Sequence, residues 1–280
     1  MDLADHIAAW ERAMAETEYF SLDKTPTAER PGLWDRLSHT YDLALGSDTA
    51  RVERTMAILE QIGALTPQTV AIDIGCGTGS FALELAKKCE RVYAIDTSPG
   101  MLEQLAQKAK GIPNLIPVLG DWNEIAPGDL DPRVNLALSC LNPGIRDFKS
   151  LDKMNTISKA WCCYISALGN SVGTDATRNE LQELILGSTL RSAGGNSVIF
   201  PQNILTAMGY APQLWEIPCA WTRSVEKAEA VDQIIADYSR FTEINAELSA
   251  RIEVYITSKL DKTGRYTQTA STTLGALTWR

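Results

Sequence analysis

The stretch that decides the fold is Val70-Ala-Ile-Asp73-Ile-Gly75-Cys76-Gly77-Thr78-Gly79. Apolar positions surround an acid and lead directly into three alternate glycines, and a helical pattern follows at once. That order is typical of a buried parallel strand, a tight turn and a helix N-terminus. Glycines allow a sharp turn and close approach to a ligand because they have no Cβ, and the helix offers unpaired N–H groups and its positive dipole end. The stretch therefore predicts a site for a nucleotide-like molecule across this turn.

The overall composition is that of an ordinary globular protein. The 280 residues are 45% hydrophobic and 22% charged, and the net charge is −9. This acidic balance argues against sustained nucleic-acid binding, which needs a basic surface, and against docking on anionic membranes. The six cysteines form no Cys-x-x-Cys pair, so we expect neither a disulfide framework nor a metal site. A basic-then-apolar signal segment and an apolar run of about 18 residues are both absent, which predicts a cytoplasmic protein.

Strand-like and helix-like patterns alternate along the central chain. Helical stripes precede the glycine turn over 3–14, from Pro31 to Tyr41, and from Ser47 or Asp48 to Gly63. Strand patterns follow at 70–74, 92–95, 115–119, 134–140 and 161–168, with helical patterns between them. Such alternation predicts a parallel sheet covered on both faces, and these sheets bind ligands beyond the carboxyl ends of their strands.

The last third of the chain is less regular. Leu214 to Thr222 predicts a sixth strand that Pro218 interrupts, two helices are predicted between 224 and 260, and 272–279 alternates as a last strand. We therefore divide the chain into four parts. These are an N-terminal helical cap (1–66), an α/β core (67–223), a helical insertion at the ligand-facing end of the sheet (224–266) and a final strand of the core (267–280).

Two interpretations of the glycine turn compete. Gly77-Thr-Gly79-Ser-Phe-Ala82 satisfies G-x-G-x-x-A, the pattern of dinucleotide-binding dehydrogenases. Asp73-Ile-Gly75-Cys-Gly77-Thr-Gly79 is also D-x-G-x-G-x-G, which resembles the first motif of class I S-adenosylmethionine-dependent methyltransferases. A glycine turn that binds nothing is a third possibility, whereas a P-loop is excluded because no lysine follows the glycines.

Two further segments at predicted strand ends favour the methyltransferase resemblance. Asp96-Thr97-Ser98-Pro-Gly-Met101-Leu102 resembles the D-x-S-x-x-M-L run of that superfamily. Gly120-Asp121-Trp122 follows the third strand, where those enzymes place an acid or amide beside the adenine. The resemblance covers residues 66–145. It implies a Rossmann-like α/β fold with seven mostly parallel strands, helices on both faces, and S-adenosylmethionine as the cofactor.

The same resemblance assigns parts of the cofactor to individual residues. Asp73 would lie near the methionine amino group, the glycines would contact the methionyl and ribose parts, Asp96 would hold the ribose and Asp121 the adenine. The cofactor-binding residues that it implies are Trp34, Tyr41, Asp73, Gly75, Gly77, Thr78, Gly79, Asp96, Thr97, Ser98, Met101, Gly120, Asp121, Trp122 and Ser139.

Three residues are candidates for the catalytic step, namely His39, Tyr41 and Asn142. The stretch from Trp34 to Asp42 resembles the aromatic and acidic segment before the core of many small-molecule members, in which the tyrosine closes over the cofactor. A helix packed on the sheet edge is the alternative. His39 is the sole imidazole near a predicted site, and is either a base or a surface histidine. Asn142 ends the fourth strand, where the acceptor meets the methyl group, but Asn142-Pro143-Gly144 also fits a simple turn.

The function predicted by this resemblance is methyl transfer to a small-molecule acceptor by direct in-line displacement. Because the donor sulfonium is already activated, positioning of the reactants accounts for much of the catalysis. We expect the first sixty residues and the 224–266 helices to cover the acceptor pocket, and we expect no nucleic-acid or membrane partner. A nicotinamide-dependent oxidoreductase is one alternative. A non-catalytic S-adenosylmethionine sensor or assembly protein, with the same cofactor residues but no open acceptor pocket, is the other.

Overall fold

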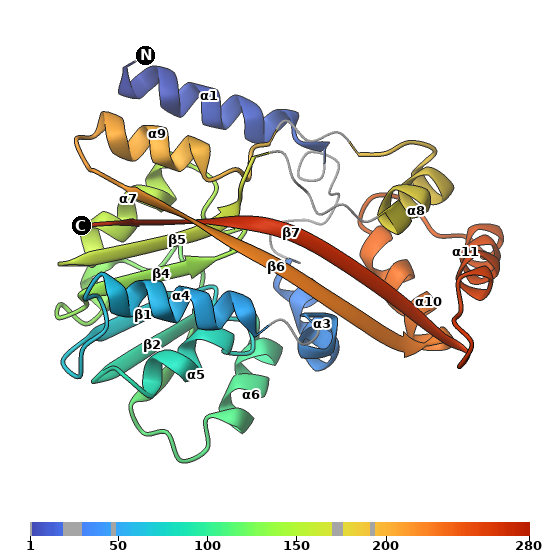
Figure 1. The fold of residues 1–280 in the computed structure, drawn as a ribbon, viewed down its shortest axis with the longest axis horizontal. Helices are drawn as coiled ribbons and strands as arrows, with labels where there is room; N and C mark the ends of the chain where they lie inside the picture. The colour runs from blue at the N-terminus through green and yellow to red at the C-terminus, as the bar shows by residue number, and fades with distance from the viewer. Residues whose placement is uncertain (1, 19–29, 46–48, 170–175, 191–193) are drawn as a thin grey trace.

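The computed structural model describes residues 2–18, 30–45, 49–169, 176–190 and 194–280, and its centre is a seven-stranded sheet (Figure 1). The strand order is β3-β2-β1-β4-β5-β7-β6, and every pair is parallel except those that involve β7. The strands are β1 (Val70–Ile74), β2 (Arg91–Asp96), β3 (Leu115–Leu119), β4 (Leu136–Cys140), β5 (Trp161–Ala167), β6 (Gln213–Glu226) and β7 (Arg265–Trp279). The predicted seven-stranded, mostly parallel sheet is confirmed.

Helices cover both faces of this sheet. One face carries α4 (Ala50–Gln61), α5 (Ser80–Ala86) and α6 (Pro99–Lys108), and the other carries α1 (Leu3–Glu16), α7 (Phe148–Ile157) and α9 (Ile199–Ala207). Each face has its own apolar core because alternate residues of every strand point to opposite sides. Among the described residues, no helix combines the length and apolar character that crossing a membrane requires.

The N-terminal helices lie in two different places. α1 packs on α9, and the indole of its buried Trp10 donates a hydrogen bond to the Gly195 carbonyl at 2.8 Å. α3 (Arg30–Leu45) instead packs against α6 near the carboxyl ends of the strands (Figure 1). The predicted helix caps Ser47 and Asp48 lie outside the described residues, and α4 begins at Ala50 without a side-chain cap. Of these helices, α3 is therefore the one placed to reach the ligand-binding edge.

The sixth strand runs without a break, which corrects the expectation that Pro218 interrupts it. β6 pairs with β7 over its whole length, and Pro218 lies opposite Thr273. The physical reason is position, because β6 is the edge strand of the sheet. A proline is tolerated on an edge strand where its missing N–H would have faced away from the ladder.

The β6–β7 hairpin extends past the sheet and carries a separate helical unit. β7 is antiparallel to β5, and Leu274 pairs with Ala167 at the end of β5, so residues before Leu274 project beyond the carboxyl edge. α8 (Ala176–Leu186), α10 (Lys227–Tyr238) and α11 (Ala246–Ser258) pack there on the hairpin (Figure 1). They share a third apolar core with the hairpin, which includes Val225 and Tyr266. We call this unit the hairpin subdomain.

Candidate active site

The glycine turn after β1 adopts backbone conformations that favour glycine. Gly75 and Gly77 have φ values of 71° and 54°. A Cβ on Gly75 would lie 2.6 Å from Cγ of Asn142, so even alanine has no room there. A Cβ on Gly77 would be in ordinary contact with the Tyr41 ring, at 3.5 Å. The turn is also tied to the neighbouring strand, because the N–H groups of Gly75 and Cys76 both donate to the Ile95 carbonyl at 2.9 Å.

Asp96 connects this turn to the end of β2. Its Oδ2 accepts a hydrogen bond from the Gly77 N–H at 2.8 Å, and its Oδ1 accepts one from the Ser98 N–H at 2.9 Å. Burial raises the pKa of the Asp96 carboxyl, while the two N–H groups lower it. Each carboxylate oxygen accepts more than one hydrogen bond, so Asp96 retains capacity for a ligand hydroxyl.

Asp73, the acid at the start of the glycine motif, is deeply buried. Its side chain is 2% exposed, and its Oδ2 has no hydrogen-bond partner among the described residues. Burial raises the pKa of this carboxyl to about 7, although the N–H of Ala82 at the start of α5 lowers it. An unsatisfied buried oxygen costs about 1–3 kcal/mol, which a donor or positive group beside it would offset. Asp73 itself does not line the cavity described below.

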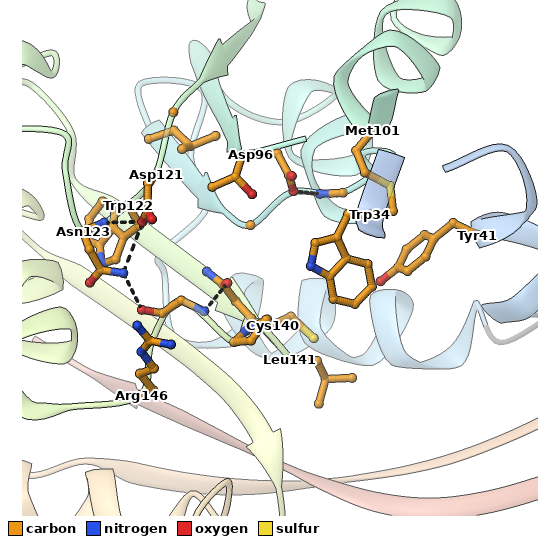
Figure 2. Close-up of a pocket in the computed structure, with 18 residues that line it drawn as sticks. Trp34, Tyr41, Asp96, Met101, Asp121, Trp122, Asn123, Cys140, Leu141 and Arg146 are labelled. Atoms are coloured by element: carbon orange, nitrogen blue, oxygen red, sulfur yellow. Dashed lines mark hydrogen bonds between the residues drawn. The ribbon is translucent and has the colours of Figure 1, made fainter. Parts of the chain in front are cut away.

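Asp121 and Trp122 follow β3, and Asp121 lies on the side of Asp96 opposite Trp34 and Tyr41 (Figure 2). Oδ1 of Asp121 accepts hydrogen bonds from the N–H and the side-chain amide of Asn123, at 2.8 and 3.2 Å. The Trp122 ring is buried, and its indole N–H donates to the Ser150 carbonyl at 3.0 Å. Nζ of Lys153 lies 4.5 Å from the ring centroid, which fixes the ring from one face. Trp122 therefore offers a rigid apolar wall and Asp121 a polar edge.

α3 supplies the opposite wall through two aromatic residues. The rings of Trp34 and Tyr41 pack edge to face, with centroids 6.3 Å apart. Burial raises the pKa of the Tyr41 phenol, so it stays neutral at physiological pH. Figure 2 shows both rings on one side of Asp96, with Asp121 on the other.

Two acids that the sequence interpretation left without a role anchor α3. Oδ1 of Asp35 accepts hydrogen bonds from Oγ of Ser98 at 2.5 Å and from the Gly100 N–H at 2.8 Å, at the N-terminus of α6. Asp42 accepts a hydrogen bond from Oγ1 of Thr78 at 2.5 Å and forms an ion pair with Lys108. The available signal was their spacing of seven residues, which puts both acids on one face of a helix.

The end of β4 forms the floor of the site. Asn142 donates from Nδ2 to the Ile74 carbonyl at 3.1 Å and accepts at Oδ1 from the Gly144 N–H at 2.8 Å, so both ends of its amide hold the backbone. Leu141 has a φ of 50°, a conformation that costs a branched residue about 1–3 kcal/mol. Burial raises the pKa of the Cys140 thiol to about 11, so the thiol is protonated.

These elements enclose one cavity of about 160 Å³ at the carboxyl ends of β1, β2, β3 and β4, which we call the sheet-edge cavity (Figure 2). Of the residues named from the sequence, it brings together Trp34, Tyr41, Gly75, Gly77, Asp96, Thr97, Met101, Gly120, Asp121, Trp122 and Asn142. The remaining lining residues, which were not among the predicted site residues, are Ile95, Asn123, Cys140, Leu141, Pro143, Gly144 and Arg146.

Six predicted residues lie outside this lining, namely Asp73, Thr78, Gly79, Ser98, Ser139 and His39. Gly79 makes room for α6, since a Cβ there would lie 2.3 Å from Leu105. Ser98 caps α6 through the Met101 N–H, and Ser139 donates to the Ile74 carbonyl. His39 is exposed and shares a hydrogen bond with Gln104 at 3.0 Å.

The predicted cover of the cavity is provided by α3 among the described helices. No described residue of α1 or of 224–266 lines the sheet-edge cavity. Within the described ranges, no group of three or more His, Cys, Asp or Glu side chains could hold a metal ion.

Comparison with known proteins supports the same interpretation of the core. A family profile described as "Methyltransferase domain" matches residues 71–151. The tRNA (guanine(37)-N(1))-methyltransferase Trm5b of Pyrococcus abyssi is 33% identical over 87 residues, which cover 27% of this chain and 26% of that protein. A probable cobalt-precorrin-6B C(15)-methyltransferase (decarboxylating) of Methanocaldococcus jannaschii is 44% identical over 43 residues, covering 15% and 24%. The chain thus spans about a quarter of the length of these two curated relatives.

Among solved structures, the YcgJ protein from Bacillus subtilis superposes with a TM-score of 0.50 at 14% identity, over 81% of this chain and 98% of that one. This likeness concerns the fold, and it extends well beyond the segment matched by the family profile. The profile match, the strand order and the glycine turn agree. Residues 71–151 are thus similar to a methyltransferase domain, and the resemblance to class I S-adenosylmethionine-dependent methyltransferases predicted from the sequence is confirmed.

Proposed function

We propose that this chain transfers a methyl group from S-adenosylmethionine to a small-molecule acceptor within the sheet-edge cavity. The observation that carries the proposal is that three groups of residues line the same cavity. The glycine turn and Asp96 stand at one wall, Asp121 and Trp122 at another, and the end of β4 is open to the same space. A cofactor and an acceptor could therefore meet there.

The residues present fit S-adenosylmethionine chemically. Gly75 and Gly77 leave backbone exposed for the methionyl and ribose parts, and Asp96 has acceptor capacity for ribose hydroxyls. Asp121 would accept from the adenine amino group, between the apolar side chains of Ile95, Met101 and Trp122. Oδ2 of Asp73, which has no partner among the described residues, is an acceptor suited to the amino group through a bridging water molecule, since Asp73 lies behind the cavity lining.

The bound cofactor supplies an activated methyl group on a sulfonium. The chain's own contribution is to align and to exclude water, because the phenol and the thiol beside the end of β4 are in their neutral forms. Tyr41 stays a phenol and Cys140 a thiol, and no described imidazole lines the cavity. Alignment contributes roughly 7–11 kcal/mol in favourable cases. The site therefore suits an acceptor that is nucleophilic without deprotonation by the protein.

The open floor favours an enzyme over a sensor that only binds the cofactor. Cys140, Leu141 and Asn142 face the cavity and do not fill it. The names of the curated relatives cover both a tRNA base and a corrinoid precursor, so they select no acceptor. We infer a small molecule because the chain carries a net charge of −9, whereas an RNA acceptor requires a basic surface.

The test is calorimetric titration with S-adenosylhomocysteine and, separately, with NAD. We expect the first to bind and the second not to. Asp96→Ala should weaken S-adenosylhomocysteine binding by about 1–3 kcal/mol, which is about 5- to 150-fold, because a charged hydrogen-bonding partner is lost. Asp129→Ala is the matched control, since this acid is exposed on the short turn Pro127–Asp129 outside the cavity. Binding of NAD alone would contradict the proposal and restore the oxidoreductase alternative.

A further inference from the structure

The hairpin subdomain contains a second cavity, which we call the hairpin cavity. It lies between α8, α10 and the projecting part of the hairpin, and its volume is about 340 Å³, roughly twice that of the sheet-edge cavity. No described residue lines both cavities. Gln268 of its wall stands six residues before Leu274, which is roughly 20 Å beyond the edge of the sheet at about 3.3 Å per residue. The hairpin cavity is therefore a separate space.

The charges around the hairpin cavity are unusual for an acidic chain. Among the described residues, Arg178, Arg223 and Arg240 line it together with one carboxylate, that of Asp237. Asp237 interacts electrostatically with all three arginines. Glu229 stands nearby and attracts Arg223, but its Oε1 also accepts a hydrogen bond from Nε2 of Gln233. The lining itself carries an excess of positive charge.

Two buried polar atoms of residues that line the hairpin cavity make no hydrogen bond to the described residues. Nε of Arg223 and Oε1 of Gln233 have no hydrogen-bond partner among the described residues. Leaving such atoms unsatisfied disfavours the folded state, and more so for a charged group, so a ligand that pairs with them is favoured. Burial lowers the pKa of the Arg223 guanidinium. An arginine keeps its charge in a folded protein, so this charge is held in a partly desolvated position. A donor and an acceptor are thus both available on one wall.

We propose that the hairpin cavity is a binding site for a small anion that carries a carboxylate or phosphate group together with a hydrogen-bond donor. The anionic group would pair with the guanidinium of Arg223, which matches planar and tetrahedral oxyanions through several N–H groups. The donor would reach Oε1 of Gln233. Leu181, Ile234 and Phe241 give the remaining wall its apolar character, which suits the carbon skeleton of a small metabolite. This site is distinct from the proposed methyl-transfer site and does not depend on it.

The experiment is calorimetric titration of the full chain with inorganic phosphate, with malate, whose hydroxyl is a hydrogen-bond donor, and with uncharged malamide. We expect saturable binding of at least one of the two anions and none of malamide. Phosphate alone would assign the phosphorylated class of ligand, and malate alone the carboxylate class. Arg223→Gln should weaken the binding at least tenfold. Lys262→Gln, which removes an equal charge from an exposed position near the hairpin tip, should leave it unchanged.

A second variant keeps the test decisive if Arg223→Gln does not fold. Gln233→Glu has the same shape but adds a negative charge to the wall, and we expect at least a tenfold loss of anion binding. S-Adenosylhomocysteine titration of the same samples reports separately on the sheet-edge cavity and should be unaffected. Absence of binding by both anions, or unchanged binding by both variants, would overturn the proposal.

Discussion

The two cavities of this chain are built by different means. The sheet-edge cavity takes most of its polar lining from short motifs that follow neighbouring parallel strands, so residues close in sequence meet around one edge. The hairpin cavity depends on antiparallel pairing between distant segments, in which Arg223 stands opposite Gln268. The residues around the sheet-edge cavity come largely from the segment that matches the methyltransferase family profile. The hairpin cavity lies in segments outside that match.

Burial acts on the two cavities with opposite electrostatic results. Beside the sheet-edge cavity, burial raises the pKa values of Asp73 and Asp96, because it disfavours carboxylates. In the hairpin cavity it lowers the pKa of Arg223, because it disfavours the guanidinium. Each region thus retains charged groups that folding alone does not favour. Ligands of opposite charge, a cationic amino group in one case and an anion in the other, would offset that cost.

The largest effect that tests this comparison is expected from Gly75→Ala. The new Cβ meets both a positive φ, which costs about 1–2 kcal/mol, and the amide of Asn142 at 2.6 Å. Displacing that amide also breaks its bonds to the Ile74 carbonyl and the Gly144 N–H, for a total of about 3–5 kcal/mol. We expect at least a hundredfold loss of S-adenosylhomocysteine affinity by calorimetry, and a lower midpoint of thermal unfolding.

Gly209→Ala is the matched control for backbone strain. Gly209 has a φ of 94°, but no heavy atom from the described part of the chain lies within 4 Å of the Cβ position. It should therefore lose about 1–2 kcal/mol of stability and bind S-adenosylhomocysteine as the wild type does. Equal affinity losses in the two variants would show that strain alone, and not the contact with Asn142, shapes the sheet-edge cavity.

Asp73→Asn is expected to have the next largest effect, and it depends on pH. The pKa of this carboxyl is about 7 in the fold and about 3.9 in an unfolded chain, so the folded state holds the proton more tightly. The stability contribution is therefore complete below about pH 4 and is lost as the pH rises towards 7. Asparagine has no charge to bury, so the variant should be more stable by up to about 4 kcal/mol at pH 8, because the two pKa values differ by about 3.

Denaturant unfolding at pH 4.5 and at pH 8 measures this difference directly. The two proteins should have similar free energies of unfolding at pH 4.5 and should diverge at pH 8. The same substitution should weaken S-adenosylhomocysteine binding, since Oδ2 is the acceptor that we assign to the amino group. A stability difference that does not change with pH would show that Asp73 is not the titrating group.

The sheet-edge cavity could be predicted in large part because its signals are local. The alternation of strands and helices placed Asp96 and Asp121 at strand ends, and parallel pairing brings such ends to one edge. Gly79 and Ser98 belong to the same motifs yet serve helix packing and capping, because a motif records which residues recur and not which atoms face the ligand.

The hairpin subdomain could be predicted only in outline. Its strands and helices were visible as patterns, but the length of the hairpin depends on pairing between residues about 40 to 65 positions apart. Pro218 suggested a break because a local rule cannot tell an edge strand from a central one. The arginine cluster also left no sequence signal, since Arg178, Arg223 and Arg240 meet only after the chain has folded.

The smallest expected effect comes from comparing substitutions on the two faces of α3, the helix that closes the sheet-edge cavity. Asp35→Ala removes the acceptor for Ser98 Oγ and the Gly100 N–H, so the helix should dock less firmly. S-Adenosylhomocysteine affinity should fall by about 3- to 10-fold, the loss of roughly 1 kcal/mol of hydrogen bonding. His39→Ala, on the exposed side of the same helix, should stay within twofold of the wild type, because its hydrogen bond to Gln104 is on the surface. If His39→Ala instead weakens binding or turnover more than Asp35→Ala does, α3 must rotate in the complex and bring the imidazole to the acceptor. The wall formed by Trp34 and Tyr41 would then be only one of the positions of α3.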